Sequence, residues 1–169
     1  SGFIFSILCG IAFVKREKRT VHPLIDLSLF RNPRLFFPLL ANLIMFMTIA
    51  AHNFLIPFYL DLIKYMTPAR IGLFLMIYSI VFVIVPPVAG RYADRVNPVL
   101  ISTLAMAITA FSFFFFSFTL HLGGLLFVVV FFVIRAVGNG MFIPPNNILI
   151  MEVSPEKNQG ALSGVLNTV

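Results

Sequence analysis

The stretch that decides the fold is residues 122–151, which read LGGLLFVVVFFVIRAVGNGMFIPPNNILIM. It is longer than the roughly 20 residues that an α-helix needs to cross the hydrocarbon core of a bilayer. The strands of membrane barrels are about ten residues long and alternate in polarity, whereas Leu125–Val133 is apolar on every side. The stretch is therefore predicted to be a transmembrane helix.

Composition extends this interpretation to the whole chain. The 169 residues are 60% hydrophobic and 11% charged, whereas soluble domains carry about 25% charged residues. So few charges cannot cover the surface of a water-soluble globule of this size. The single cysteine, Cys9, excludes an internal disulfide and has no companions of the kind that a metal site needs. We therefore expect an all-α integral membrane protein, a polytopic helix bundle with no metal and no cofactor.

Three further apolar stretches are long enough to cross the bilayer. The four predicted spans are Leu35–Leu60, Ile71–Ala89, Val99–Leu120 and Leu122–Met151. Partial spans are expected at both ends of the chain, with residues 1–14 as the end of a truncated helix and residues 155–169 as the start of another. We therefore expect a piece of a longer chain.

Most of the predicted helices share one local start signal, a polar residue followed by proline. The polar side chain can cap a free amide, and proline suits the first helical position because its missing N–H costs nothing there. The four signals are Asn32-Pro33, Thr67-Pro68, Asn97-Pro98 and Ser154-Pro155.

Basic residues set the expected orientation, because cytoplasmic loops carry an excess of Lys and Arg. One side has Lys15, Arg16, Lys18, Arg19, Arg31, Arg34, Arg91, Arg95 and Lys157, and the other has Lys64 and Arg70. Residues 15–34, 90–97 and 152–158 are therefore predicted to be cytoplasmic, in a multi-pass protein of a plasma or inner membrane whose first partner is the lipid bilayer. This distribution explains the net charge of +6 without nucleic acid. Within the basic linker 15–34, residues 21–31 can form a short interfacial helix or a connecting loop.

Polar side chains divide the spans into two kinds. Ile71–Ala89 and Val99–Leu120 contain no charged residue and no Asn, Gln or His. Their Ser, Thr and Tyr side chains can bond to the backbone, so these two spans can face lipid or plain helix packing. The other two spans carry groups that are costly when unpaired in hydrocarbon, and we expect them to face a bundle interior or a wet cavity. They are Asn42, His52, Asn53, Arg135, Asn139, Asn146 and Asn147.

Arg135 is the most demanding of these groups. It lies about 13 residues, or roughly 20 Å, into its span and therefore near the centre of the bilayer. Inserting an arginine at that depth costs about 2.5–3.5 kcal/mol, so we expect Arg135 to have a functional role. The alternative is a structural salt bridge between Arg135 and a helix outside the sequence. For His52 a hydrogen-bonded core histidine is favoured over a proton or substrate group.

Glycine and proline make two spans deformable. Gly138 and Gly140 permit close approach of a neighbouring helix or ligand. Pro144-Pro145 is expected to kink its helix and free carbonyls, and Pro86-Pro87 to do the same in another span. A helix interrupted at depth and lined with amides is typical of a transporter binding site, although such kinks also serve packing alone.

A loop between two spans reads Gly90-Arg91-Tyr92-Ala93-Asp94-Arg95-Val96-Asn97-Pro98. Asp94 would lie near the positive N-terminal end of the next helix, where Arg91 and Arg95 can pair with it. Such a cluster can hold two helices together in one conformation and release them in another. The loop resembles the G-x-L-a-D-r-x-G-r-k signature of the major facilitator superfamily, with Gly90, Ala93, Asp94 and Arg95 matching.

Two further stretches resemble the fourteen-helix drug:proton antiporter family of that superfamily. Residues 22–32 look like the beginning of its second six-helix half, and residues 135–147 followed by 160–168 are similar to its tenth-to-eleventh helix region. The resemblance implies a partial C-terminal six-helix half, holding the end of the second extra helix, helices seven to ten and the start of eleven. It also implies that helices seven and ten line a central cavity, that eight is partly central and that nine is peripheral.

On this resemblance the expected function is transport by alternating access, as a proton-coupled multidrug or small-molecule efflux antiporter. The seven polar side chains are the candidates for the cavity and the substrate, and Gly90, Arg91, Asp94 and Arg95 would form a gating loop. The expected partners are a small-molecule substrate, protons and the N-terminal half of the same chain. Since no Asp or Glu lies deep within the four spans, a carboxylate proton carrier is expected in that half.

Alternatives of other classes stay open. A transporter of the same fold for a sugar, amino acid or siderophore fits equally, because an aromatic, amide-lined cavity does not decide among substrates. An enzyme would need a nucleophile–base pair or metal ligands at depth, and three scattered histidines offer none. A non-transporting sensor or structural subunit would not need an arginine and several amides across two helices.

Overall fold

The computed structural model describes residues 32–93, 95–122 and 124–153. They form four long helices, in the order α2 (Pro33–Leu62), α3 (Pro68–Ala93), α4 (Pro98–Thr119) and α5 (Leu125–Val153), with a short 3-10 helix η2 (Leu120–Leu122) before α5. No strand occurs in these three ranges. All four long helices are apolar and long enough to cross a membrane. The predicted all-α bundle of membrane-spanning helices is confirmed.

The predicted helix starts are confirmed at three positions. α2, α3 and α4 begin at Pro33, Pro68 and Pro98. The Asn32 side chain accepts a hydrogen bond from the Arg34 amide at 3.1 Å, and the Asn97 side chain accepts one from the Val99 amide at 2.9 Å. The fourth signal, Ser154-Pro155, lies outside the described residues, as do the partial spans 1–14 and 155–169 and nearly all of the linker 15–34.

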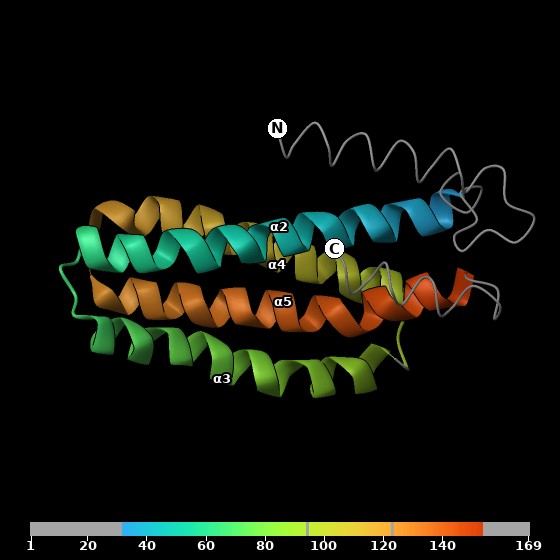
Figure 1. The fold of residues 1–169 in the computed structure, drawn as a ribbon. Helices are drawn as coiled ribbons and strands as arrows, with labels where there is room; N and C mark the ends of the chain where they lie inside the picture. Colours follow the sequence, from blue (N-terminus) through green and yellow to red (C-terminus); the bar gives the residue numbers. More distant parts are fainter. Residues whose placement is uncertain (1–31, 94, 123, 154–169) are drawn as a thin grey trace, which may run out of the picture.

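Among these helices, α5 is the central one. It contacts α2, α3 and α4, whereas α2 and α3 contact one another much less. In Figure 1 α5 runs between α2 and α3, with α4 behind. In the apolar membrane-spanning stretch of α5 half of the residues are buried, whereas in that of α3 none are. The buried polar side chains of α5, Arg135, Asn139 and Asn146, therefore have to find their partners inside the bundle.

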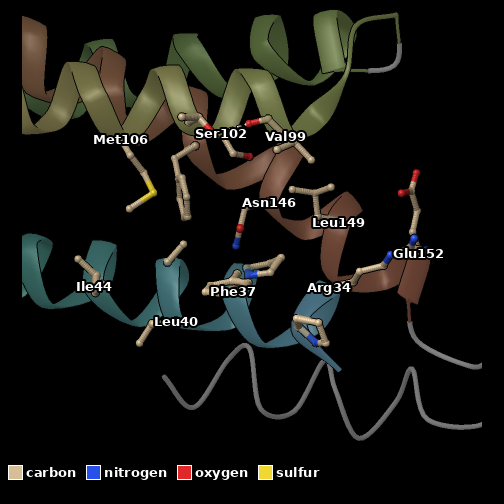
Figure 2. Close-up of a pocket in the computed structure, with 15 residues that line it drawn as sticks. Arg34, Phe37, Leu40, Ile44, Val99, Ser102, Met106, Asn146, Leu149 and Glu152 are labelled. Atoms are coloured by element: carbon tan, nitrogen blue, oxygen red, sulfur yellow. Dashed lines mark hydrogen bonds between the residues drawn. The ribbon is translucent and has the colours of Figure 1, made fainter. Parts of the chain in front are cut away.

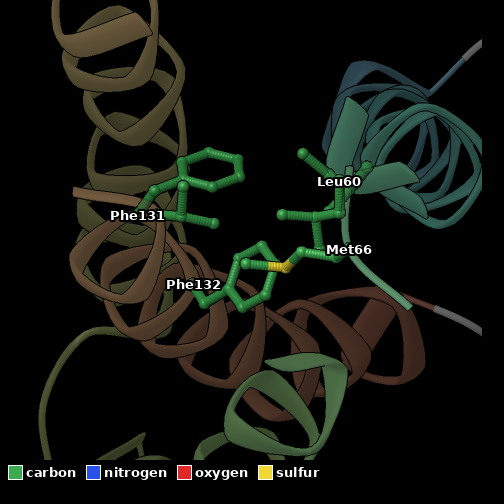
Figure 3. Packing of buried hydrophobic residues seen from close by; sticks show 6 residues of the cluster. Leu60, Met66, Phe131 and Phe132 are labelled. Atoms are coloured by element: carbon green, nitrogen blue, oxygen red, sulfur yellow. The ribbon is translucent and has the colours of Figure 1, made fainter. Parts of the chain in front are cut away.

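Aromatic packing closes one end of the bundle. Phe131 and Phe132 of α5 are almost fully buried and pack with Leu60 and Met66, as Figure 3 shows. The ring of Phe116 on α4 stacks on Phe131 with 4.4 Å between the ring centroids. This cluster contacts all four long helices, because residues of α3 also pack against it.

Two glycines bring α5 against its neighbours. A Cβ atom on Gly138 would lie 2.5 Å from Thr109 Oγ1 and 3.2 Å from the Ala105 carbonyl oxygen, both on α4. A Cβ atom on Gly140 would lie 2.8 Å from the Cβ of Val85 on α3. Real Cβ atoms essentially never approach other atoms to 2.5 or 2.8 Å, so a larger residue at Gly138 or Gly140 would force neighbouring atoms to shift.

Proline does not interrupt α5. The helix continues through Pro144 and Pro145, and α3 continues through Pro86 and Pro87. The interruption expected at depth is therefore not found. Proline keeps the φ angle of a helix but lacks the N–H that would bond to the carbonyl four residues earlier, so the expected kinks and free carbonyls stay predictions. Pro145 is fully buried.

We predict that Gly138→Ala and Gly140→Ala destabilise the full-length protein, because each new methyl group overlaps a neighbouring helix. Overpacking of this kind costs about 1–3 kcal/mol. Thermal unfolding of the detergent-solubilised protein would measure it as a lower midpoint. Gly72→Ala is the matched control, since a Cβ atom there meets nothing within 4 Å. Equal midpoints for all three variants would contradict the close helix approach.

Candidate functional site

Arg135 lies near the middle of α5 and is completely buried. Its Nη1 donates a hydrogen bond to Asn139 Oδ1, one turn along the same helix, and its Nη2 donates to Thr48 Oγ1 on α2 at 2.7 Å. Its Cζ atom lies 4.8 Å from the ring centroid of Phe113 on α4, within the range of a cation–π interaction. One buried cation thus connects three helices.

Asn139 extends this arrangement to α3. Its Nδ2 donates to the Tyr78 hydroxyl at 2.7 Å, while its Oδ1 accepts from Arg135, so both ends of the amide are used. The Thr48 hydroxyl donates to the Met45 carbonyl at 2.7 Å, which leaves its oxygen free to accept from the guanidinium. The residues Thr48, Tyr78, Phe113, Arg135 and Asn139 are referred to below as the Arg135 cluster.

The partners of Arg135 in this cluster are all uncharged. Within the described ranges the acidic residues are Asp61 and Glu152, which lie near the ends of α2 and α5. Hydroxyl and amide oxygens and an aromatic face therefore stabilise the positive charge. The Nε atom of Arg135 is buried and has no hydrogen-bond partner in the described part of the chain. The cluster carries one positive charge that its own members do not neutralise.

His52 packs beside the cluster through its ring. The ring centroid lies 4.8 Å from that of Tyr78, 5.7 Å from that of Phe131 and 5.4 Å from that of Phe132. Neither ring nitrogen has a hydrogen-bond partner among the residues that the structure describes. His52 is buried, as expected of a core histidine. The hydrogen bond that was also expected is not found among the described residues, where the imidazole has aromatic rings as neighbours.

The other predicted polar residues form a buried pair and an exposed pair. Asn42 and Asn146 are buried, outside the Arg135 cluster, whereas Asn53 and Asn147 are exposed. The exposed pair does not face the interior of the described bundle, and that Asn53 and Asn147 face a wet cavity instead stays a prediction. Asn147 points about 100° away from buried Asn146. Asn53 shares a face of α2 with Asn42, but the described helices cover that face only at Asn42.

A cavity of about 810 Å³ opens between α2 and α4, away from the Arg135 cluster. Figure 2 shows α2 and α4 on its two sides and Asn146 of α5 between them. This cavity is referred to as the α2–α4 groove. Most of its wall is apolar, and Arg34 and Glu152 lie at its rim. Of the predicted site residues that the structure describes, Asn146 alone lines this groove.

The predicted gating loop is described only in part. Gly90 and Arg91 lie near the end of α3, and Arg91 and Arg95 are exposed. The amides of Arg95 and Val96 both donate to the Tyr92 carbonyl at 3.0 Å, which turns the chain out of α3. Asp94 lies outside the described residues. Its pairing with the arginines stays a prediction.

Three members of the Arg135 cluster are not among the predicted site residues. Tyr78 and Phe113 lie on α3 and α4, the two helices assigned to lipid or plain packing, and the structure corrects that assignment at these positions. A phenol in the middle of a membrane helix needs a hydrogen-bond partner, and this requirement could have identified Tyr78 from the sequence. Thr48 precedes His52 by one helical turn and so shares its face. Nothing in the sequence distinguishes Phe113 as a site residue, because the chain has 21 phenylalanines.

Comparison with known proteins gives one family match. The family model for the Major Facilitator Superfamily matches residues 2–169. The chain is 26% identical over 166 residues to the riboflavin transporter RibZ of Clostridioides difficile (strain 630), covering 98% of the chain and 36% of that protein. It is 24% identical over 165 residues to the uncharacterized transporter YebQ of Escherichia coli (strain K12), covering 98% and 36%.

A third relative is named for efflux. The chain is 24% identical over 168 residues to the multidrug efflux pump LfrA of Mycolicibacterium smegmatis (strain ATCC 700084 / mc(2)155), covering 99% of the chain and 33% of that protein. The chain thus spans about a third of the length of these curated relatives. No solved structure gives a significant match.

We predict that Tyr78→Phe and Thr48→Val each lower the stability of the folded protein, because each removes a hydrogen-bond acceptor of the cluster. Hydrogen bonds between membrane helices contribute about 0.6 kcal/mol on average and about 1.7 kcal/mol at most. The double variant should differ from the sum of the two, since both bonds act through the Arg135–Asn139 pair.

Thermal unfolding of the full-length protein would measure these changes. Ser79→Ala is the matched control, because Ser79 is exposed on α3 and donates to the Leu75 carbonyl of its own helix. Shifts no larger than that of Ser79→Ala would show that the cluster does not hold the helices together.

Proposed function

The chain belongs to the Major Facilitator Superfamily, and from this premise we propose that the full-length protein moves small molecules across a membrane by alternating access. It is an integral, multi-pass membrane protein. The proposed mode is proton-coupled efflux of drugs or other small molecules, as in the fourteen-helix drug:proton antiporters. The proposed orientation has residues 15–34, 90–97 and 152–158 in the cytoplasm.

The observation that carries this proposal is the buried charge of Arg135 among uncharged partners. Ionisable groups inside a membrane are expensive, and they mark substrate or ion pathways by default. An arginine kept only for structure would be expected to meet a carboxylate, which accepts stronger hydrogen bonds than a hydroxyl does. Among the described residues the hydrogen-bond partners of Arg135 are a hydroxyl and an amide group, so its charge is left for a negative group from the substrate or from another part of the chain.

This arrangement suggests how such a group would act. A carboxylate that approaches Arg135, on the substrate or on another part of the chain, would compete with Thr48 because charge-assisted hydrogen bonds are about twice as strong as neutral ones. Losing the contact with Thr48 removes a hydrogen bond between α2 and α5, while Asn139 and Tyr78 still connect α5 with α3. A bond that opens in one state and closes in another is what alternating access requires. The carboxylate that carries protons is proposed to lie outside the four spans.

Transport of a different solute is the second candidate. It is favoured by the relative RibZ, which is named as a riboflavin transporter and matches the chain about as well as the efflux pump LfrA does. Assays of dye export and of riboflavin uptake by the full-length protein would separate the two candidates.

We predict that Arg135→Ala lowers transport by about tenfold or more, because two hydrogen bonds of about 0.6–1.7 kcal/mol each correspond to such a factor. Arg135→Lys should retain part of the activity, since it keeps the charge but not the forked geometry that reaches two acceptors. Transport of a fluorescent substrate into everted vesicles would be measured at equal amounts of membrane-inserted protein. Arg70→Ala, at an exposed residue of α3, is the control. Full transport by Arg135→Ala would remove the cluster from the mechanism.

The gating loop of Gly90, Arg91, Asp94 and Arg95 gives a separate prediction. Asp94→Asn should slow the exchange between the two access states, because an amide cannot neutralise the adjacent arginines. Substrate counterflow in proteoliposomes would report this exchange without a proton gradient. Tyr92→Phe, at an exposed position of the same loop, should behave like the unaltered protein. Normal counterflow by Asp94→Asn would exclude the loop as a latch.

A further inference from the structure

The imidazole of His52 has two buried ring nitrogens that the Arg135 cluster does not use. The residue is 3% exposed, and neither Nδ1 nor Nε2 has a hydrogen-bond partner in the described ranges. A neutral imidazole carries one N–H donor and one nitrogen with a free lone pair. Leaving both unpaired inside a bundle destabilises the fold. The free lone pair is also a basic site that can accept a proton.

His52 lies one helical turn from the bond that joins α2 to Arg135. On α2 it follows Thr48 by four residues, and on α5 Phe131 precedes Arg135 by four. The rings of His52 and Phe131 pack together, while Thr48 accepts its hydrogen bond from Arg135. These two contacts are neighbouring steps of one interface between α2 and α5. One turn corresponds to roughly 6 Å along the helix axis.

The titratable and charged groups that face His52 come from α3 and α5. Tyr78 of α3 lies beside it, with 4.8 Å between the ring centroids, and Arg135 of α5 is close enough to interact with it electrostatically. α4 contains no titratable side chain. On α2 itself, Tyr59 lies two turns further along the same face, and the exposed Asp61 lies on the opposite face. Among the described residues the imidazole thus faces a cation but no carboxylate.

Protonation of His52 would place a second positive charge beside the first. Three aromatic rings have their centroids 4.8, 5.7 and 5.4 Å from that of the imidazole, within the range at which aromatic faces attract a cation. These rings can hold an imidazolium but do not neutralise it. Like charges repel strongly where water is excluded. Because α2 carries the imidazole and α5 the guanidinium, this repulsion acts to separate the two helices.

We propose that His52 is a proton-binding residue and that its protonation opens the hydrogen bond between Thr48 and Arg135. This inference rests on the proposed function, because the movement of α2 from α5 is taken as a step of alternating access. The proton adds to the lone pair of one ring nitrogen. The ring gains one N–H bond and one positive charge, and no other covalent bond changes.

The depth of His52 suits a proton that arrives from the outer side. It precedes the end of α2 at Leu62 by ten residues and follows the start at Pro33 by nineteen, or roughly 15 Å and 28 Å. In the proposed orientation Leu62 is at the outer end, where proton-driven efflux takes up its protons. The imidazole is buried while α2 and α5 are in contact, so their separation is what exposes it to water. Proton binding and helix separation therefore favour one another.

Distances between two spin labels on the full-length protein test this coupling without transport. The labels replace Leu62 of α2 and Leu126 of α5, which are 64% and 71% exposed near the same end of the bundle. Acidification from about pH 8 to about pH 5, the range in which histidine changes charge, should shift the population towards a longer distance. His52→Phe keeps an aromatic ring but cannot bind a proton, so the shift should fall by at least half. His121→Gln, at the exposed histidine of η2, is the matched control and should keep the full shift.

Three results would overturn the proposal. They are a distance that does not change with pH in the unaltered protein, a shift in His52→Phe that falls by less than half, and an equal loss in His121→Gln. Arg135→Gln tests the repulsion, because it removes the second charge and should also reduce the shift by at least half. A full shift in Arg135→Gln would show that the two charges do not act on one another.

Nuclear magnetic resonance of the full-length protein with carbon-13 in its histidine rings tests proton binding itself. The signal that is missing from His52→Phe belongs to His52, and its chemical shift should change between about pH 8 and about pH 5. A signal that stays constant over this range would show that His52 binds no proton. An unaltered protein that transports nothing would contradict the proposed function, whereas the label distances and the imidazole signal are judged without transport.

Discussion

A positive charge in the middle of a membrane-spanning helix has to be stabilised by the protein, because hydrocarbon supplies neither water nor a counter-ion. Arg135 meets this requirement with partners from other helices: Thr48 on α2, Phe113 on α4 and, through Asn139, Tyr78 on α3. Each partner has to lie at the same depth as the guanidinium. These contacts therefore help to set the register of three helices against α5, together with the side-chain packing between them.

The close approach that this register needs is encoded just after Arg135 on α5. Gly138 admits the backbone of α4, and Gly140 admits Val85 of α3. Residues 135–140 thus contain both the charge that needs partners and the glycines that let two helices come near enough to supply them. Helix packing in membranes depends on such small residues because the lipid gives apolar side chains little reason to leave it.

The helices could be predicted from the sequence because length, apolar runs and Asn-Pro starts are properties of single segments. Arg135 and Asn139 were also predictable as buried groups, since charge and amides are costly in lipid wherever they occur. Their partners were not, because nothing within one helix says which residue of another lies opposite. In the sequence, the Tyr78 hydroxyl can find a hydrogen-bond partner on the backbone of its own helix, and Phe113 resembles any other phenylalanine. For the same reason the exposure of Asn53 and the aromatic surroundings of His52 emerge only from the packed bundle.

One stripe of α5 connects the Arg135 cluster with the α2–α4 groove. Arg135, Asn139, Phe142 and Asn146 are spaced by four, three and four residues, so they lie within about 60° on one face, and all four are buried. Around Arg135 and Asn139 this face has its partners on α2 and α3, whereas at Asn146 it borders the groove between α2 and α4. A shift of α2 that breaks the bond between Thr48 and Arg135 therefore also changes the width of the groove. A group that binds in the groove contacts α2, which is also the helix that Thr48 connects to Arg135. A movement of α2 would therefore change both sites.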